Sequence, residues 1–100
     1  MTEIEVKLST APDAAAAEEL VEACAARLGL NQTMKGTLAR YPGCAHWHFK
    51  RGRERGTLEV TWWPRERRLW LSVQAGRRAG WIEAAAGNLK AALENPLSWR

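Results

Sequence analysis

The sequence predicts one α+β domain over residues 1–100, in which two helices pack on one face of an antiparallel sheet of about three to five strands. Two observations predict this fold. Several short segments alternate apolar and polar residues, which is typical of strands with one buried face. Two longer segments carry an apolar stripe at helical spacing, and because each is apolar on one side only, both should cover the sheet in the order β-α-(β)-β-β-β-α.

The N-terminal third should hold a strand and a helix. Residues 3–8 alternate in polarity and predict a short, half-buried strand. A helix should follow, with Thr10 as its N-cap, Asp13 in the capping-box position and Gly29 ending it in a Schellman motif. The apolar stripe of this helix consists of Ala17, Leu20, Val21, Cys24 and Leu28.

The middle of the chain should form a meander of antiparallel strands. Strands are predicted at residues 44–50, 57–63 and 68–74, after a weaker one at about 34–40. A type II turn at residues 42–43, which are proline and glycine, should separate the weaker strand from the next one.

A second helix is expected over residues 79–94. It should end at Asn95-Pro96, because proline cannot continue a helix. Its apolar stripe consists of Ile82, Ala86, Leu89 and Leu93.

The pleat of the three central strands assigns each residue to one of two faces. The apolar set should face the helices, and it consists of Ala45, Trp47, Phe49, Leu58, Val60, Trp62, Leu69, Leu71 and Val73. The short connections give a register in which His48 lies opposite Glu59 and His46 lies opposite Thr61. The outward face then carries the rows His48–Glu59–Ser72 and His46–Thr61–Trp70, with Cys44, Trp63 and Arg68 beside them.

Three interpretations of this outward face stay open. In the first it is a mixed polar and aromatic surface without a ligand. In the second it is a contact face made of His46, His48, Thr61, Trp63 and Trp70. Two tryptophans on an otherwise exposed sheet need a cover, which we expect to be a second copy of the chain in a homodimer, the C-terminal segment or a ligand.

The third interpretation is a catalytic or metal site. His46 or His48 could act as a base, with Glu59 as the carboxylate that orients it. Cys44, His46 and His48 also form a Cys-x-His-x-His run. Side chains on one face of a strand stand ~7 Å apart, however, whereas zinc needs donors converging at ~2 Å. The sequence therefore favours a non-catalytic protein without a metal or a cofactor.

Positive charge gathers toward one predicted end of the sheet. Residues 34–100 hold thirteen basic and five acidic residues, a net charge of +8, whereas residues 1–33 hold two basic and six acidic residues, a net charge of −4. The register brings the loop after the first central strand close to the start of the last helix. We expect this patch to bind RNA or another polyanion by its backbone, unless it is only a solvated surface. Its residues are Lys50, Arg51, Arg53, Arg55, Arg77 and Arg78.

Residues 13–94 follow the order helix–strand–strand–strand–helix, with a basic loop after the first core strand and a basic start to the last helix. This arrangement resembles the double-stranded-RNA-binding domain, a family in which these two elements straddle the RNA phosphates. The resemblance implies phosphate contacts from both elements, made by Arg51, Arg53, Arg55, Arg77 and Arg78.

The stretch GCAHWHFKRGRERGTLEV, residues 43–60, carries a second resemblance. Gly43, a histidine at 46 or 48, Phe49 and the basic loop are similar to the Gly-Ser/Thr-His-x-x-Phe-like signature of the small HicA-type toxins. Those toxins share this fold and are messenger-RNA interferases. The resemblance implies an alternative function as an interferase, in which His46 or His48 is the catalytic residue.

Other features bear on where the chain acts. The first ten residues lack the basic start and apolar run of a signal peptide, and no apolar segment approaches transmembrane length. Cys24 lies on a helical apolar stripe and Cys44 shows no motif spacing with it, so Cys24 is expected to be a reduced, buried thiol. We therefore expect a cytoplasmic protein with no membrane partner.

Overall fold

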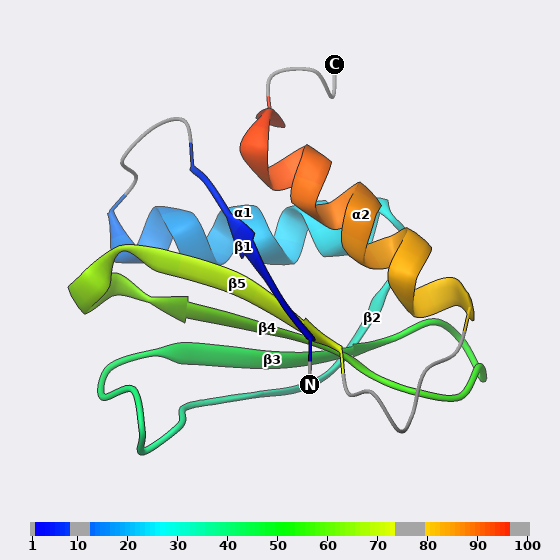
Figure 1. The fold of residues 1–100 in the computed structure, drawn as a ribbon, viewed down its shortest axis with the longest axis horizontal. Helices are drawn as coiled ribbons and strands as arrows, with labels where there is room; N and C mark the ends of the chain where they lie inside the picture. Colours follow the sequence, from blue (N-terminus) through cyan, green and yellow to red (C-terminus); the bar gives the residue numbers. More distant parts are fainter. Residues whose placement is uncertain (1, 9–12, 74–79, 97–100) are drawn as a thin grey trace.

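The computed structural model describes residues 2–8, 13–73 and 80–96 and confirms the predicted α+β fold (Figure 1). An antiparallel five-stranded sheet in the order β1-β5-β4-β3-β2 carries both helices on one face. The strands are β1 (Thr2–Val6), β2 (Asn31–Gly36), β3 (Ala45–Lys50), β4 (Leu58–Trp63) and β5 (Arg68–Val73), and the helices are α1 (Ala14–Arg27) and α2 (Gly80–Glu94). Among the described residues, no helix has the length and apolar character needed to span a bilayer.

The central strands pair in the predicted register. His48 lies opposite Glu59 and His46 lies opposite Thr61 across β3 and β4. Thr61 in turn lies opposite Trp70 on β5. β1 extends the sheet beyond β5, and β2 extends it beyond β3, so these two strands form the edges.

The weaker predicted strand lies earlier in the chain than expected. β2 spans Asn31–Gly36, not residues 34–40. The end of α1 explains the shift, because Leu30 N–H donates to the Ala25 carbonyl at 3.0 Å and Gly29 has a φ of +76°. This is the predicted Schellman motif, and it turns the chain directly into the strand.

The start of α1 also differs from the prediction. Asp13 is the N-cap, and its carboxylate accepts the N–H of Ala16 at 2.8 Å. Aspartate caps a helix as well as threonine does, so Asp13 takes the role predicted for Thr10, which lies outside the described residues.

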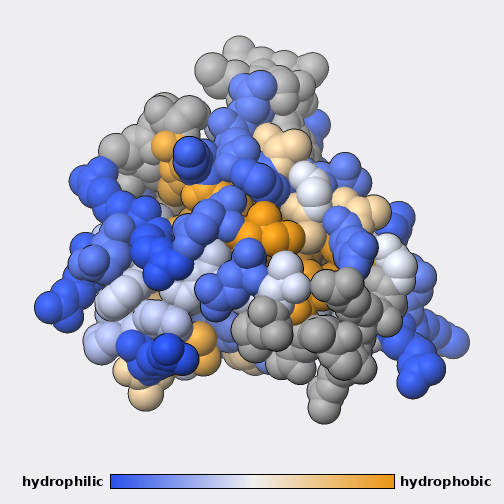
Figure 2. Space-filling view, viewed as in Figure 1, coloured by the Kyte–Doolittle hydropathy of each residue, from blue (hydrophilic) through white to orange (hydrophobic). Residues whose placement is uncertain are grey.

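The core lies between the sheet and the two helices. All the inward-facing residues predicted for the three central strands are buried, and Trp47 is completely so. The predicted stripe of α2 is buried too, and Trp81 joins it, whereas Leu20 of α1 and Leu28, its C-cap residue, are partly buried. Figure 2 shows mostly hydrophilic residues around the periphery, with apolar residues reaching the surface near the middle of the view.

A polar contact joins α1 to the sheet across the edge strand β2. The indole Nε1 of Trp47 donates to Glu22 Oε2 at 3.0 Å. Lys35 Nζ lies 3.0 Å from the same oxygen and 2.8 Å from Glu18 Oε1. The Trp47 hydrogen bond, supported by Lys35 and opposed by burial, holds the pKa of Glu22 below its ordinary value of 4.5. The ionised form of Glu22 therefore stabilises the fold.

The Glu22→Gln variant should lower the free energy of unfolding at pH 7 by about 0.5–1 kcal/mol, a small value because solvent screens the contact. The folded-state pKa of Glu22 lies below the unfolded one, so the contribution is present above about pH 4.5 and is lost as the pH falls through the folded-state pKa. Urea denaturation at pH 7 and at pH 3 measures it, with Glu19→Gln, an exposed position on the same helix, as the control. An effect of Glu22→Gln that is equal at both pH values would contradict this assignment.

Candidate functional site

Part of the outward face of the sheet is covered by the chain itself. Tyr41, from the connection between β2 and β3, packs edge-on against Trp70 and Trp63, with ring centroids 4.9 Å and 5.1 Å apart. The Arg68 guanidinium lies 4.5 Å from the centroid of the Trp70 ring. Trp70 is therefore only 2% exposed and Trp63 is half-buried. Among the described residues, Tyr41 thus supplies a cover for the two tryptophans that the sequence did not suggest.

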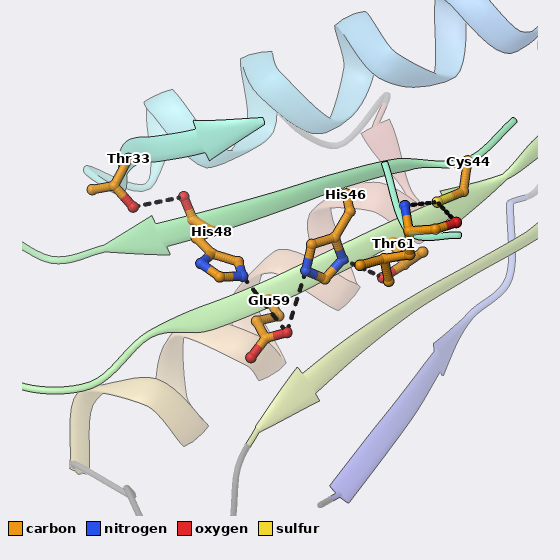
Figure 3. Close-up of polar contacts among 7 residues, drawn as sticks. Thr33, Cys44, His46, His48, Glu59 and Thr61 are labelled. Atoms are coloured by element: carbon orange, nitrogen blue, oxygen red, sulfur yellow. Dashed lines mark hydrogen bonds and ion pairs between the residues drawn. The ribbon is translucent and has the colours of Figure 1, made fainter. Parts of the chain in front are cut away.

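Hydrogen bonds fix the connection that carries Tyr41. Cys44 N–H donates to the Tyr41 carbonyl at 3.0 Å, which closes the predicted type II turn. Trp63 Nε1 donates to the Pro42 carbonyl at 3.1 Å. Cys44 Sγ accepts the N–H of Leu38 at 3.3 Å, so the thiol lies against the connection and not beside the histidines (Figure 3).

His46, His48 and Glu59 meet on the outward face, beyond the part that Tyr41 covers. One oxygen, Glu59 Oε1, lies 3.3 Å from His46 Nε2 and 3.8 Å from His48 Nε2 (Figure 3). One ligand atom from each of the three residues lies within 4.8 Å of the other two. The His46 side chain is buried, whereas that of His48 is 36% exposed. The structure thus brings together the three residues of the alternative catalytic interpretation.

His46 is held in place by the neighbouring strand. Its Nδ1 lies 2.8 Å from Thr61 Oγ1, and both residues are buried. Burial lowers the pKa of His46, although the nearby Glu59 carboxylate acts in the opposite direction. The ring is therefore neutral at neutral pH, and its single N–H is either on Nδ1, toward Thr61, or on Nε2, toward Glu59.

The loop between β3 and β4 lies beside the start of α2, as Figure 1 shows. The indole Nε1 of Trp81, in the first turn of α2, donates to the Arg55 carbonyl at 2.7 Å. Asn31, at the start of β2, accepts the N–H of Gly52 through its side-chain oxygen at 3.1 Å. The backbone of the loop is thus anchored to two other elements.

The basic side chains of this loop differ in their freedom. Lys50 Nζ donates to the Gly56 carbonyl at 3.2 Å, and Arg51 Nε lies 3.9 Å from a Glu54 carboxylate oxygen. Arg53 and Arg55 are exposed. The other two residues of the predicted patch, Arg77 and Arg78, lie outside the described residues.

Comparison of the chain with protein-family models, with curated proteins and with solved structures gives no match.

Two functional contacts were missed by sequence reasoning. The cover given by Tyr41 has a signal, because a type II turn at residues 42–43 brings Tyr41 beside Cys44, an outward-facing residue. The hydrogen bond from Trp81 to the Arg55 carbonyl has no signal in the sequence, because the sequence does not reveal which backbone group an indole N–H reaches.

Proposed function

We propose that this chain binds structured RNA, or another polyanion with closely spaced phosphates, through the basic loop between β3 and β4. The observation that carries the proposal is the hydrogen bond from Trp81 Nε1 to the Arg55 carbonyl at 2.7 Å. It holds an arginine-bearing loop against the first turn of a helix. Arginines on an anchored backbone lose less conformational entropy on binding than arginines on a loose one.

The charge of the loop supports the same function. Residues 50–56 hold four basic residues and one acidic residue, and Arg53 and Arg55 are exposed to solvent. Guanidinium groups bind phosphate oxygens through paired hydrogen bonds. Such contacts position a nucleic acid by its backbone and do not select a base sequence.

The resemblance to the double-stranded-RNA-binding domain supports the proposal at this end of the sheet. The basic loop follows β3 and lies beside the start of α2, which are the two elements that contact phosphates in that family. The chain has four strands between its helices, one more than the order on which the resemblance rests, and the additional strand is the edge strand β2. On this proposal the interface is confined to the loop and the helix start.

A catalytic function is the second candidate, favoured by the proximity of Glu59 to both histidines. In an interferase-like reaction one histidine would remove the proton of the attacking 2′-hydroxyl group. The 36% exposure of the His48 side chain favours His48 over the buried His46 for this role. Glu59 Oε1, 3.8 Å from His48 Nε2, would orient the ring.

The Arg53→Glu, Arg55→Glu double variant should bind a 20-base-pair RNA duplex at least ~10-fold more weakly than the parent, with a salt slope smaller by about 2. Parent affinity itself should fall about 10–100-fold between 50 and 200 mM salt if about three phosphates are contacted. Fluorescence anisotropy at four salt concentrations measures both quantities.

The matched control is Arg40→Glu, Arg65→Glu, which makes the same change in net charge at exposed positions on the opposite end of the sheet. Equal losses of RNA affinity in both double variants would show that net charge, and not the position of the loop, determines binding.

Analysis of the RNA recovered after each titration separates binding from cleavage. We expect the RNA to be intact. Cleavage by the parent protein in the presence of chelator, if it is lost in His48→Ala, would favour the catalytic function instead.

A further inference from the structure

We propose that His46, His48 and Glu59 form a binding site for one divalent transition-metal ion of the zinc type, with His46 Nε2, His48 Nε2 and Glu59 Oε1 as the donors. The site lies on the outward face, across β3 and β4, and is separate from the basic loop that carries the proposed RNA function. Imidazole nitrogens and a carboxylate oxygen are ligands that Zn²⁺, Co²⁺ and Ni²⁺ accept, and they are less suited to Ca²⁺ and Mg²⁺.

The spacing of the donors is the first argument. Two donors that each lie ~2.1 Å from a tetrahedral ion are ~3.4 Å apart. Glu59 Oε1 lies 3.3 Å from His46 Nε2 and 3.8 Å from His48 Nε2, and a ligand atom from each residue lies within 4.8 Å of the others. The pair formed by Glu59 Oε1 and His46 Nε2 already has this spacing, and side-chain rotation would have to close the wider separations by up to about 1.4 Å.

The lengths of these contacts are the second argument. An N–H···O hydrogen bond is usually ~2.9–3.0 Å long, and a separation of 3.8 Å is too long for one. Glu59 Oε1 is therefore at the long end of the hydrogen-bond range from His46 Nε2 and beyond that range from His48 Nε2. An ion between them would take one donor atom from each of the three residues.

The orientation of His46 is the third argument. A metal-bound histidine usually donates its other ring N–H to a fixed acceptor, which sets the tautomer and aims the free nitrogen. His46 Nδ1 lies 2.8 Å from the buried Thr61 hydroxyl, so a proton on Nδ1 is accommodated there. In that tautomer, one of the two described above, His46 Nε2 carries the lone pair that a metal ion accepts.

The sequence favoured no metal because Cys44, His46 and His48 follow one another along a single strand. The structure replaces Cys44 by Glu59 of the next strand, which lies directly opposite His48. The Cys44 thiol instead accepts the Leu38 N–H at 3.3 Å. Three protein donors leave a tetrahedral ion one further position, and the partly exposed His48 side lets water or a small ligand reach it.

Zn²⁺ added to chelator-treated full-length protein should raise its Tm by more than ~5 °C at ten times the dissociation constant. Co²⁺ should give the intense visible absorption of a low-coordinate ion, saturating at one ion per chain.

His48→Ala and Glu59→Gln should each weaken Zn²⁺ binding at least ~100-fold, and Thr61→Val, which keeps the side-chain shape, about 10-fold or more. Isothermal titration calorimetry measures these changes, and metal-free melting of each variant shows that it is folded.

Cys44→Ser is the matched control, since it alters the remaining member of the Cys-x-His-x-His run but none of the proposed donors. It should bind Zn²⁺ with the affinity of the parent. Loss of binding in Cys44→Ser, unchanged binding in both His48→Ala and Glu59→Gln, or no Co²⁺ absorption in the parent would each overturn the proposal. None of these results alters the RNA titrations, which depend on Arg53 and Arg55.

Discussion

Replacing Trp47 by alanine is expected to lower the free energy of unfolding by about 3–5 kcal/mol, the range for large-to-small changes of aromatic residues in a core. Trp47 is completely buried between the sheet and the helices. Its indole N–H also donates to Glu22 at 3.0 Å, so truncation removes a hydrogen bond as well as packing. Urea denaturation at equilibrium, followed by far-UV circular dichroism, measures the loss.

The Trp47→Phe variant is the control for the core assignment. It keeps an aromatic ring in the same place and removes the N–H donor, so it should cost clearly less than Trp47→Ala. A loss below about 1 kcal/mol in Trp47→Ala is typical of a surface residue and would reverse the assignment of the two sheet faces.

Trp70→Ala should also cost about 3–5 kcal/mol, although Trp70 lies on the outward face. A tryptophan on an open sheet face would give a clearly smaller loss. Trp70 should lose as much as a core residue because it is only 2% exposed. The centroid of its ring lies 4.9 Å from that of Tyr41 and 4.5 Å from the Arg68 guanidinium. A double-mutant cycle with Tyr41→Ala should give a coupling free energy of about 0.5–1.5 kcal/mol.

Protein concentration separates this explanation from a homodimer through the same face. If Tyr41 is the cover, the loss in Trp70→Ala is the same at 1 µM and at 100 µM, two concentrations on the order of those that resolve a weak dimer. A parent stability that rises with concentration, with the rise absent in Trp70→Ala, would show that a second copy covers the residue. Trp63→Ala, at a half-buried neighbouring position, should cost less in either case.

The fold was largely predictable because alternation and helical stripes are local signals. The inward set around Trp47 and Val60 was identified from the pleat alone, and the pairing of His48 with Glu59 followed from the short loops. The β2 prediction was displaced because residues 31–36 are exposed throughout and carry no apolar alternation. An edge strand with two solvated faces leaves little pattern in the sequence.

The candidate sites were predictable only in part. Pleat and register placed His46, His48 and Glu59 together, but the proximity of both histidines to one carboxylate oxygen depends on side-chain rotamers, which a sequence pattern does not specify. The cover over Trp70 comes from a long-range contact with Tyr41, 29 positions earlier in the chain. Contacts of that kind are set by how a connection folds, and sequence periodicity does not describe connections.

The pairing of β1 with β5 has a consequence for how the chain folds. Thr2 lies opposite Val73, so partners 71 positions apart in the sequence must meet before the sheet is complete. β3, β4 and β5 are joined by short loops, and their pairing carries a much lower loop-closure entropy. β1, which precedes the other four strands in the chain, is therefore expected to join the sheet last, and until it does β5 exposes an unpaired edge to other chains.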